Sequence, residues 1–170
     1  VSDNGVTASF SGRTGFGIEV RSGSKRNLVE ENRLNGGSTA RTRKGLNAIV
    51  IDAPDNRVRD NIIRNWYSDG VQVNENNTTV VGNTLRSNYD RGIAVFDVSK
   101  VNITDNIVTG SGEFAETTAD GIYVDASEVT LRRNEVSRNE GDGYHLIGVT
   151  SATIRNNSAN SNDDHAIRLE

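Results

Sequence analysis

A short apolar motif that returns seven times between Gly17 and Leu169 constrains the fold of this chain most. Each copy has a small residue, an apolar residue, a variable residue and a second apolar residue, as in G-I-E-V, G-V-Q-V and G-I-Y-V. Six copies are followed by a second apolar run that ends in asparagine: Asn32, Asn61, Asn83, Asn106, Asn134 and Asn157. These asparagines lie 22 to 29 residues apart, a period typical of a solenoid of stacked units.

A leucine-rich repeat has a similar period, but two features of this sequence favour a different solenoid. The core positions are mainly Val and Ile rather than Leu, and no segment has the apolar spacing of a helix beyond one turn. A third apolar position follows two residues after each asparagine: Leu34, Ile63, Leu85, Val108, Val136 and Ala159. Three short strands per unit predict an all-β fold, a parallel β-helix of about six to seven coils. Stacking would place the asparagines in one internal ladder.

The repeat also defines the organisation of the chain. Residues 17–170 are predicted to form the β-helix, and residues 1–16 a partial coil or N-terminal cap. Because the chain does not begin with Met and the last coil is unfinished, we expect an excerpt of a longer chain. Further β-helix coils or a second copy would then cover the C-terminal end. Two insertions, at 36–46 and 110–119, precede the G-I-x-V motif and are expected to wall a groove.

Composition excludes several classes of function. The net charge of −4 argues against a nucleic-acid partner, because phosphate binding needs clustered Lys and Arg. The chain has no cysteine, which excludes disulfides and thiolate metal sites, and no segment apolar enough for a membrane span. It contains no signal peptide, although an extracellular or cell- or virion-surface location suits such a repeat protein.

Because side chains alternate along a strand, equivalent positions of successive coils share one outward surface. The variable position of the motif places Tyr123, His145 and Arg168 in line on three successive coils. The position before the motif, called here the pre-glycine column, contains Phe16, Asn47, Asp69, Arg91, Asp120, Asp142 and His165. Imidazole, phenol, carboxyl and guanidinium groups supply the acid, base and cation that proton-transfer chemistry on an anionic substrate needs. Candidate catalytic residues are therefore Tyr123, His145, His165, Arg168, Asp142 and Asp120.

Other outward positions are candidates for substrate binding. Phe96, Gln72, Asn74 and Asp125 lie on the same predicted face, and Phe96 offers either a stacking platform for sugar or an oligomer contact. Trp66 and Tyr67, in the turn before Asp69, have the same two interpretations. Each Asp before Gly is also an ordinary turn residue, so a purely structural role stays open.

The repeat resembles the right-handed parallel β-helix superfamily of pectate lyases, polygalacturonases and alginate epimerases. The stretch A-N-S-N-D-D-H-A-I is similar to a coil near the active site of mannuronan C5-epimerases, and His165 matches their histidine. Their D-P-H motif is replaced here by Tyr123-Val124-Asp125. Asp120, Asp142 and His165 also resemble successive polygalacturonase motifs, with one aspartate of the second motif missing.

The resemblance implies a polysaccharide-interacting protein related to lyases and epimerases, whose turnover the sequence does not establish. The alternative is a non-catalytic structural β-helix, such as a phage-type spike or a surface module. No cofactor is expected. A Ca²⁺ site formed by Asp120, Asp142, Asp163 and Asp164 is an alternative, although the sequence has no calcium-loop signature.

Overall fold

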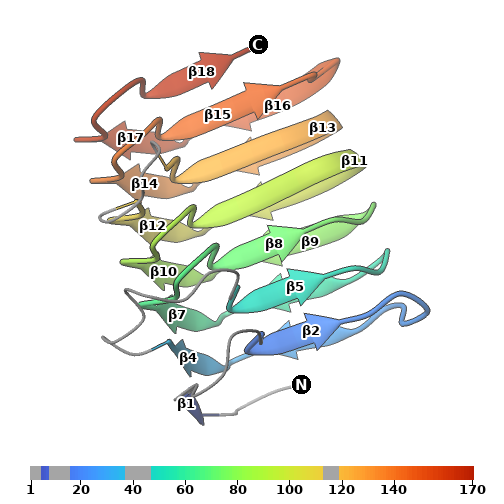
Figure 1. Ribbon diagram of the computed structural model, residues 1–170. Coiled ribbons are helices and arrows are strands. Elements are labelled where there is room, and N and C mark those ends of the chain that lie inside the picture. Colours follow the sequence, from blue (N-terminus) through green and yellow to red (C-terminus); the bar gives the residue numbers. More distant parts are fainter. Residues whose placement is uncertain (1–4, 8–15, 37–46, 113–118) are drawn as a thin grey trace.

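The computed structural model describes residues 5–7, 16–36, 47–112 and 119–170. All regular structure in these ranges is β-strand, arranged as coils that stack along one axis from the N-terminal to the C-terminal end (Figure 1). Each of these strands pairs in parallel with the equivalent strand of a neighbouring coil, over spacings of one repeat. The predicted all-β parallel β-helix is confirmed, and the described residues contain no helix that could cross a membrane.

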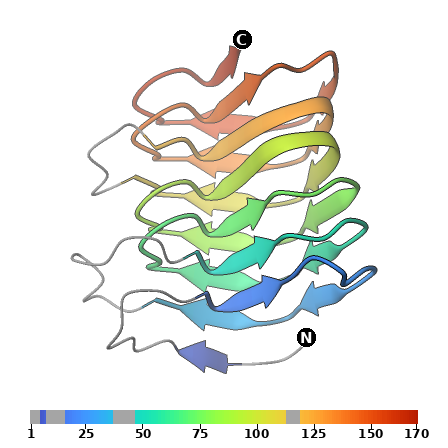
Figure 2. The same ribbon diagram turned by 45° about the vertical axis from the view of Figure 1, so that its right-hand side comes forward.

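Each coil has three faces, and the first is formed by the G-I-x-V motif. Its strands are β2 (Ile18–Val20), β5 (Ile49–Ile51), β8 (Val71–Val73), β11 (Ile93–Thr104), β13 (Ile122–Arg132), β15 (Tyr144–Ile147) and β18 (Ile167–Leu169). The second face contains β3 (Leu28–Glu30), β6 (Arg57–Arg59), β9 (Thr78–Val81) and β16 (Ser151–Arg155), together with the continuations of β11 and β13. The third contains β1 (Gly5–Thr7), β4 (Arg33–Asn35), β7 (Ile62–Arg64), β10 (Thr84–Arg86), β12 (Ile107–Thr109), β14 (Glu135–Ser137) and β17 (Ser158–Asn160). Figure 2 shows the three faces surrounding a continuous interior.

The interior is filled by the apolar residues of the repeat. Side chains alternate along each strand. In β8 the first and last residues, Val71 and Val73, are therefore buried, and Gln72 between them is half-buried. Trp66 is 1% exposed and packs in this core, so its predicted role on the surface is wrong. At the N-terminal end, β1 pairs with β4. The predicted boundary at residue 16, between the N-terminal segment and the β-helix repeats, stays a prediction.

The predicted asparagine ladder is confirmed. Asn32, Asn61, Asn83, Asn106 and Asn134 each donate their backbone N–H and their Nδ2 to the Oδ1 of the next asparagine, at 2.9–3.0 Å. The residue before each asparagine has a left-handed backbone, with φ of 55° at Glu31 and Asp60 and 69° at Gly82. This conformation lets the chain turn sharply from the second face to the third.

Candidate functional site

The candidate site lies on the outward side of the first face, over β8, β11, β13, β15 and β18. Parallel register aligns Gln72, Ala94, Tyr123, His145 and Arg168 as one column. Ala94 is fully buried and supplies no chemistry, so it separates Gln72 from Tyr123. The structure therefore brings together the candidate residues of the last three coils, with Phe96 beside them.

The rings of Phe96, Tyr123 and His145 form a continuous row across three successive coils, called here the aromatic row. The Phe96 and Tyr123 ring centroids are 5.5 Å apart and tilted, and the Tyr123 and His145 centroids are 5.4 Å apart in an edge-to-face arrangement. Both distances lie in the range of favourable aromatic pairing. Burial raises the pKa of the Tyr123 phenol, and the negative charge of Asp125 adds to the effect. Tyr123 is therefore a neutral hydrogen-bond donor near pH 7, and His145 is the better candidate base.

Arg91 belongs to this site, although its role was not predicted from the sequence. Its guanidinium carbon lies 4.7 Å from the Tyr123 centroid and 5.7 Å from the Phe96 centroid. Both contacts are within cation–π range. The sequence contained one indication of this role. In the pre-glycine column Arg91 is the only permanently cationic residue, and the other positions have Asn, Asp, Phe or His.

The pre-glycine aspartates form a ladder of their own. Asp69 Oδ1 accepts the backbone N–H of Arg91 at 3.1 Å, and Asp120 Oδ1 accepts that of Asp142 at 2.8 Å. Asp142 Oδ1 in turn accepts the backbone N–H of His165 at 2.8 Å. One oxygen of each carboxylate thus holds two coils together, which is the structural role that the sequence left open.

Two of these carboxylates also contact the histidines. Asp120 Oδ2 lies 3.0 Å from Nδ1 of His145, and Asp142 Oδ1 lies 2.8 Å from Nδ1 of His165. An Asp–His contact of this kind fixes the orientation of the imidazole and favours one tautomer. His145 Nε2 then points toward the surface, 3.5 Å from Glu170 Oε2. His145 is 14% exposed at its side chain, whereas His165 is 59% exposed.

The remaining predicted site residues lie at the edges of the candidate site. Arg168 forms an ion pair with Glu170, which lowers the pKa of that carboxyl. On the other side, Gln72 donates to Asn74 Oδ1 at 2.9 Å, and Asn74 donates to Asp52 Oδ1 at 2.6 Å. Asp125 follows Tyr123 on the same side of β13 and is half-buried. Asp163 is exposed, and it belongs to neither of the two groups of His and acidic side chains that the described residues bring within reach of one ion.

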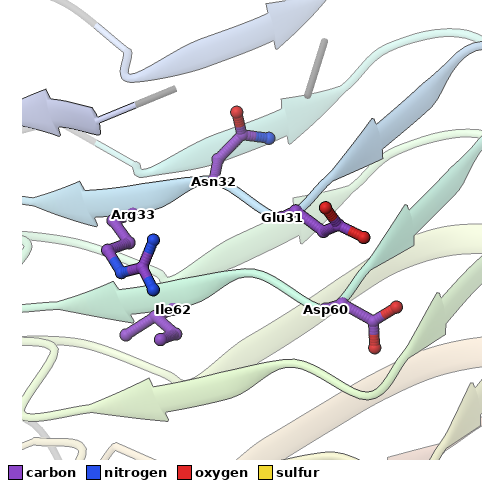
Figure 3. A pocket seen from close by; sticks show the side chains of 5 residues that line it. All are labelled: Glu31, Asn32, Arg33, Asp60 and Ile62. Atoms are coloured by element: carbon purple, nitrogen blue, oxygen red, sulfur yellow. The ribbon is translucent and has the colours of Figure 1, made fainter. Parts of the chain in front are cut away.

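A shallow hollow of about 280 Å³ lies elsewhere, near the turn between the second and third faces (Figure 3). It is lined by Glu31, Asn32, Arg33, Asp60 and Ile62. In Figure 3 the carboxylates of Glu31 and Asp60 extend to the same side from successive turns. The hollow does not include any predicted site residue. The groove walls were predicted at 36–46 and 110–119, and most of both segments, residues 37–46 and 113–118, lies outside the described residues.

Comparison with known families agrees with this architecture. The family model for a right handed beta helix region matches residues 2–117 and 71–170. The chain belongs to this family. No curated protein and no solved structure matches the chain. Membership of this family establishes the right-handed β-helix, whereas a relationship to lyases or epimerases stays a proposal.

Proposed function

We propose that the chain is a polysaccharide-interacting β-helix that binds a glycan along the aromatic row of Phe96, Tyr123 and His145. The observation that supports this proposal is the alignment of three rings on successive coils, bordered by hydrogen-bonding side chains. Sugar rings present apolar C–H faces and hydroxyl rims, so a binding face needs aromatic surfaces beside polar groups. Two coil steps cover roughly 10 Å at the sheet spacing, about the length of a disaccharide.

The finer proposal is acid–base chemistry of the lyase or epimerase type on a uronate. His145, oriented by Asp120, would remove the C5 proton, and the neutral Tyr123 phenol would donate one. Arg91, with its cation beside both aromatic rings, would neutralise the sugar carboxylate and so lower the barrier to proton loss. Such a protein would act on glycans outside the cell or at a cell or virion surface.

Binding is tested first, by isothermal titration with oligosaccharides from polygalacturonate, alginate and a neutral glucan. We expect one of the acidic ligands to bind, and Phe96→Ala or Tyr123→Ala to weaken it roughly tenfold, the equivalent of about 1.4 kcal/mol. Ile107→Ala is the matched control, because Ile107 is an exposed apolar residue of β12 on another face. Equal losses in all three variants, or no binding by any glycan, would refute the proposed face.

Turnover is tested separately, by proton NMR of the bound polymer in D₂O. Loss of the C5 proton signal with the native chain, and its retention with His145→Ala, would establish the acid–base chemistry. Binding without any change at C5 would leave a glycan-binding module and reject the lyase or epimerase proposal.

A further inference from the structure

Asp120, Asp142 and His145 form a compact and largely buried group at the base of the site. Their side chains are 9%, 2% and 14% exposed, and one ligand atom from each lies within 4.8 Å of the other two. Asp120 comes from the loop before β13, Asp142 from the loop before β15, and His145 from β15 itself. Strand pairing between β13 and β15 fixes their relative positions.

One oxygen of this group has no hydrogen bond within the described part of the chain. Asp142 Oδ1 accepts the backbone N–H of His165 and lies 2.8 Å from Nδ1 of the same residue, but the nearest polar atoms to Oδ2 are His145 Nδ1 and Arg168 Nη1, both at 3.9 Å. That separation is too long for a hydrogen bond. Arg168 instead pairs with Glu170. Nearby positive charge stabilises a carboxylate buried to this extent, and an ion between Asp142, Asp120 and His145 would lie closer to Oδ2 than Arg168 does.

The donor set indicates which cation fits. Ca²⁺ and Mg²⁺ prefer oxygen ligands alone, whereas an imidazole nitrogen with carboxylate oxygens suits Zn²⁺ and related ions. Ligand bonds of about 2.1 Å in a tetrahedral site place the ligand atoms roughly 3.4 Å apart. The distances from His145 Nδ1, 3.0 Å to Asp120 Oδ2 and 3.9 Å to Asp142 Oδ2, lie on either side of this value. Shifts of about half an ångström would bring both distances to this value.

A neighbouring carboxylate supports the same arrangement. Glu170 Oε2 faces His145 Nε2 at 3.5 Å and would accept its proton when Nδ1 binds an ion. Zinc-binding histidines usually have such a partner on the other ring nitrogen, which orients the ring. The outer group of Asp142, Asp164 and His165 offers similar donors, but its Asp164 and His165 side chains are 49% and 59% exposed. The buried group is therefore the better preorganised of the two.

We propose that Asp120, Asp142 and His145 bind a divalent transition-metal ion of the Zn²⁺ class, with at least one coordination position open to solvent or ligand. The sequence predicted no metal site. It suggested only a Ca²⁺ alternative, with Asp163 and Asp164 in place of His145. This proposal stands independently of the proposed glycan binding, but a bound ion would occupy Nδ1 of His145, so the ion-bound protein could not use His145 as the base of the proposed acid–base chemistry.

The test is isothermal titration of the chelator-treated chain with ZnCl₂, and in parallel with CaCl₂. We expect one equivalent of Zn²⁺ to bind and Ca²⁺ to bind at least about tenfold more weakly. Asp142→Asn and His145→Ala are each expected to lower the Zn²⁺ affinity at least about tenfold. The Asp142→Asn variant keeps the Oδ1 acceptor for the His165 N–H, as Asn47 does for Asp69, so it retains the coil contact.

His165→Ala is the matched control, because it removes the outer imidazole and leaves the buried group intact. Unchanged Zn²⁺ affinity in this variant supports the proposal, together with a Zn²⁺-dependent shift of the His145 ring signals in nitrogen-15 NMR. Absence of stoichiometric Zn²⁺ binding, stronger binding of Ca²⁺, or a loss in His165→Ala that exceeds the loss in His145→Ala would overturn it.

Discussion

Replacing Asp69 by asparagine tests how burial controls the ionisation of the pre-glycine column. Asp69 is 4% exposed, and burial raises the pKa of its carboxyl to about 7. The negative charge of Asp90 raises this pKa further, whereas Arg91 lowers it. In the unfolded chain the same carboxyl titrates near its ordinary value of 3.8. Between these two values the folded state holds a proton that the unfolded state has lost, so stability decreases as pH rises.

The size of this effect follows from the two pKa values. A separation from 3.8 to about 7, at about 1.4 kcal/mol per unit, corresponds to about 4 kcal/mol. The contribution is fully present below the unfolded pKa and is lost as pH passes through the folded pKa. The amide of the Asp69→Asn variant would have no charge to bury. Its oxygen would still accept the Arg91 N–H, since Asn47 Oδ1 accepts the Asp69 N–H one coil earlier.

The assay is urea-induced unfolding of the native chain and of Asp69→Asn at about pH 4 and about pH 8. The stability of the variant relative to the native chain should increase by about 4 kcal/mol from the lower to the higher pH. Other titrating groups contribute equally to both proteins and cancel. Asp90→Asn is the control: it removes a charge that raises the Asp69 pKa, so the pH-dependent difference should shrink. A difference that does not change with pH would refute the reasoning.

Two further predictions concern the coil contacts. Asn83→Ala would leave the N–H and Nδ2 of Asn61 without their Asn83 acceptor and should lower the unfolding free energy by about 3 kcal/mol. The exposed Asn160→Ala should change it by less than about 0.5 kcal/mol in the same urea titration, and equal effects would contradict the role of the ladder. Gly92→Ala would place a Cβ against Val108 and 2.8 Å from the Gly121 carbonyl oxygen, and should cost about 3 kcal/mol and a lower Tm. Gly148→Ala, where the cost is only the left-handed φ of 65°, should cost about 1 kcal/mol, and the reverse order would refute the steric explanation.

Much of the fold could be predicted because the repeat encodes it locally. Alternating Val and Ile identify the strands, and the asparagine spacing identifies the coils, as the pairing of Asn61 with Asn83 confirms. The error at Trp66 has a physical cause: a turn residue in sequence can still point inward when the turn closes over the core. The left-handed residue before each asparagine also escaped prediction, because Glu31 and Arg133 are not typical of that conformation.

The candidate site was predictable only in part. Register between coils follows from the repeat, so Tyr123, His145 and Arg168 were correctly placed in one column. The sequence does not determine which way a long side chain turns. Arg168 turns toward Glu170, and Arg91 lies close to the rings of Phe96 and Tyr123, because these contacts depend on rotamers chosen among neighbours in space.

The sequence by itself therefore determined the architecture: a periodic pattern of apolar residues and asparagines can bury its core only by stacking coil on coil. The tertiary structure decided the ionisation of the buried carboxylates and the geometry of the candidate ligands. Both depend on burial and on small differences in the distances between side chains. Asp69, Asp120 and Asp142 are alike in sequence, each one residue before a glycine. Only the fold leaves Asp69 beside Arg91 with a raised pKa and places Asp120 and Asp142 around His145.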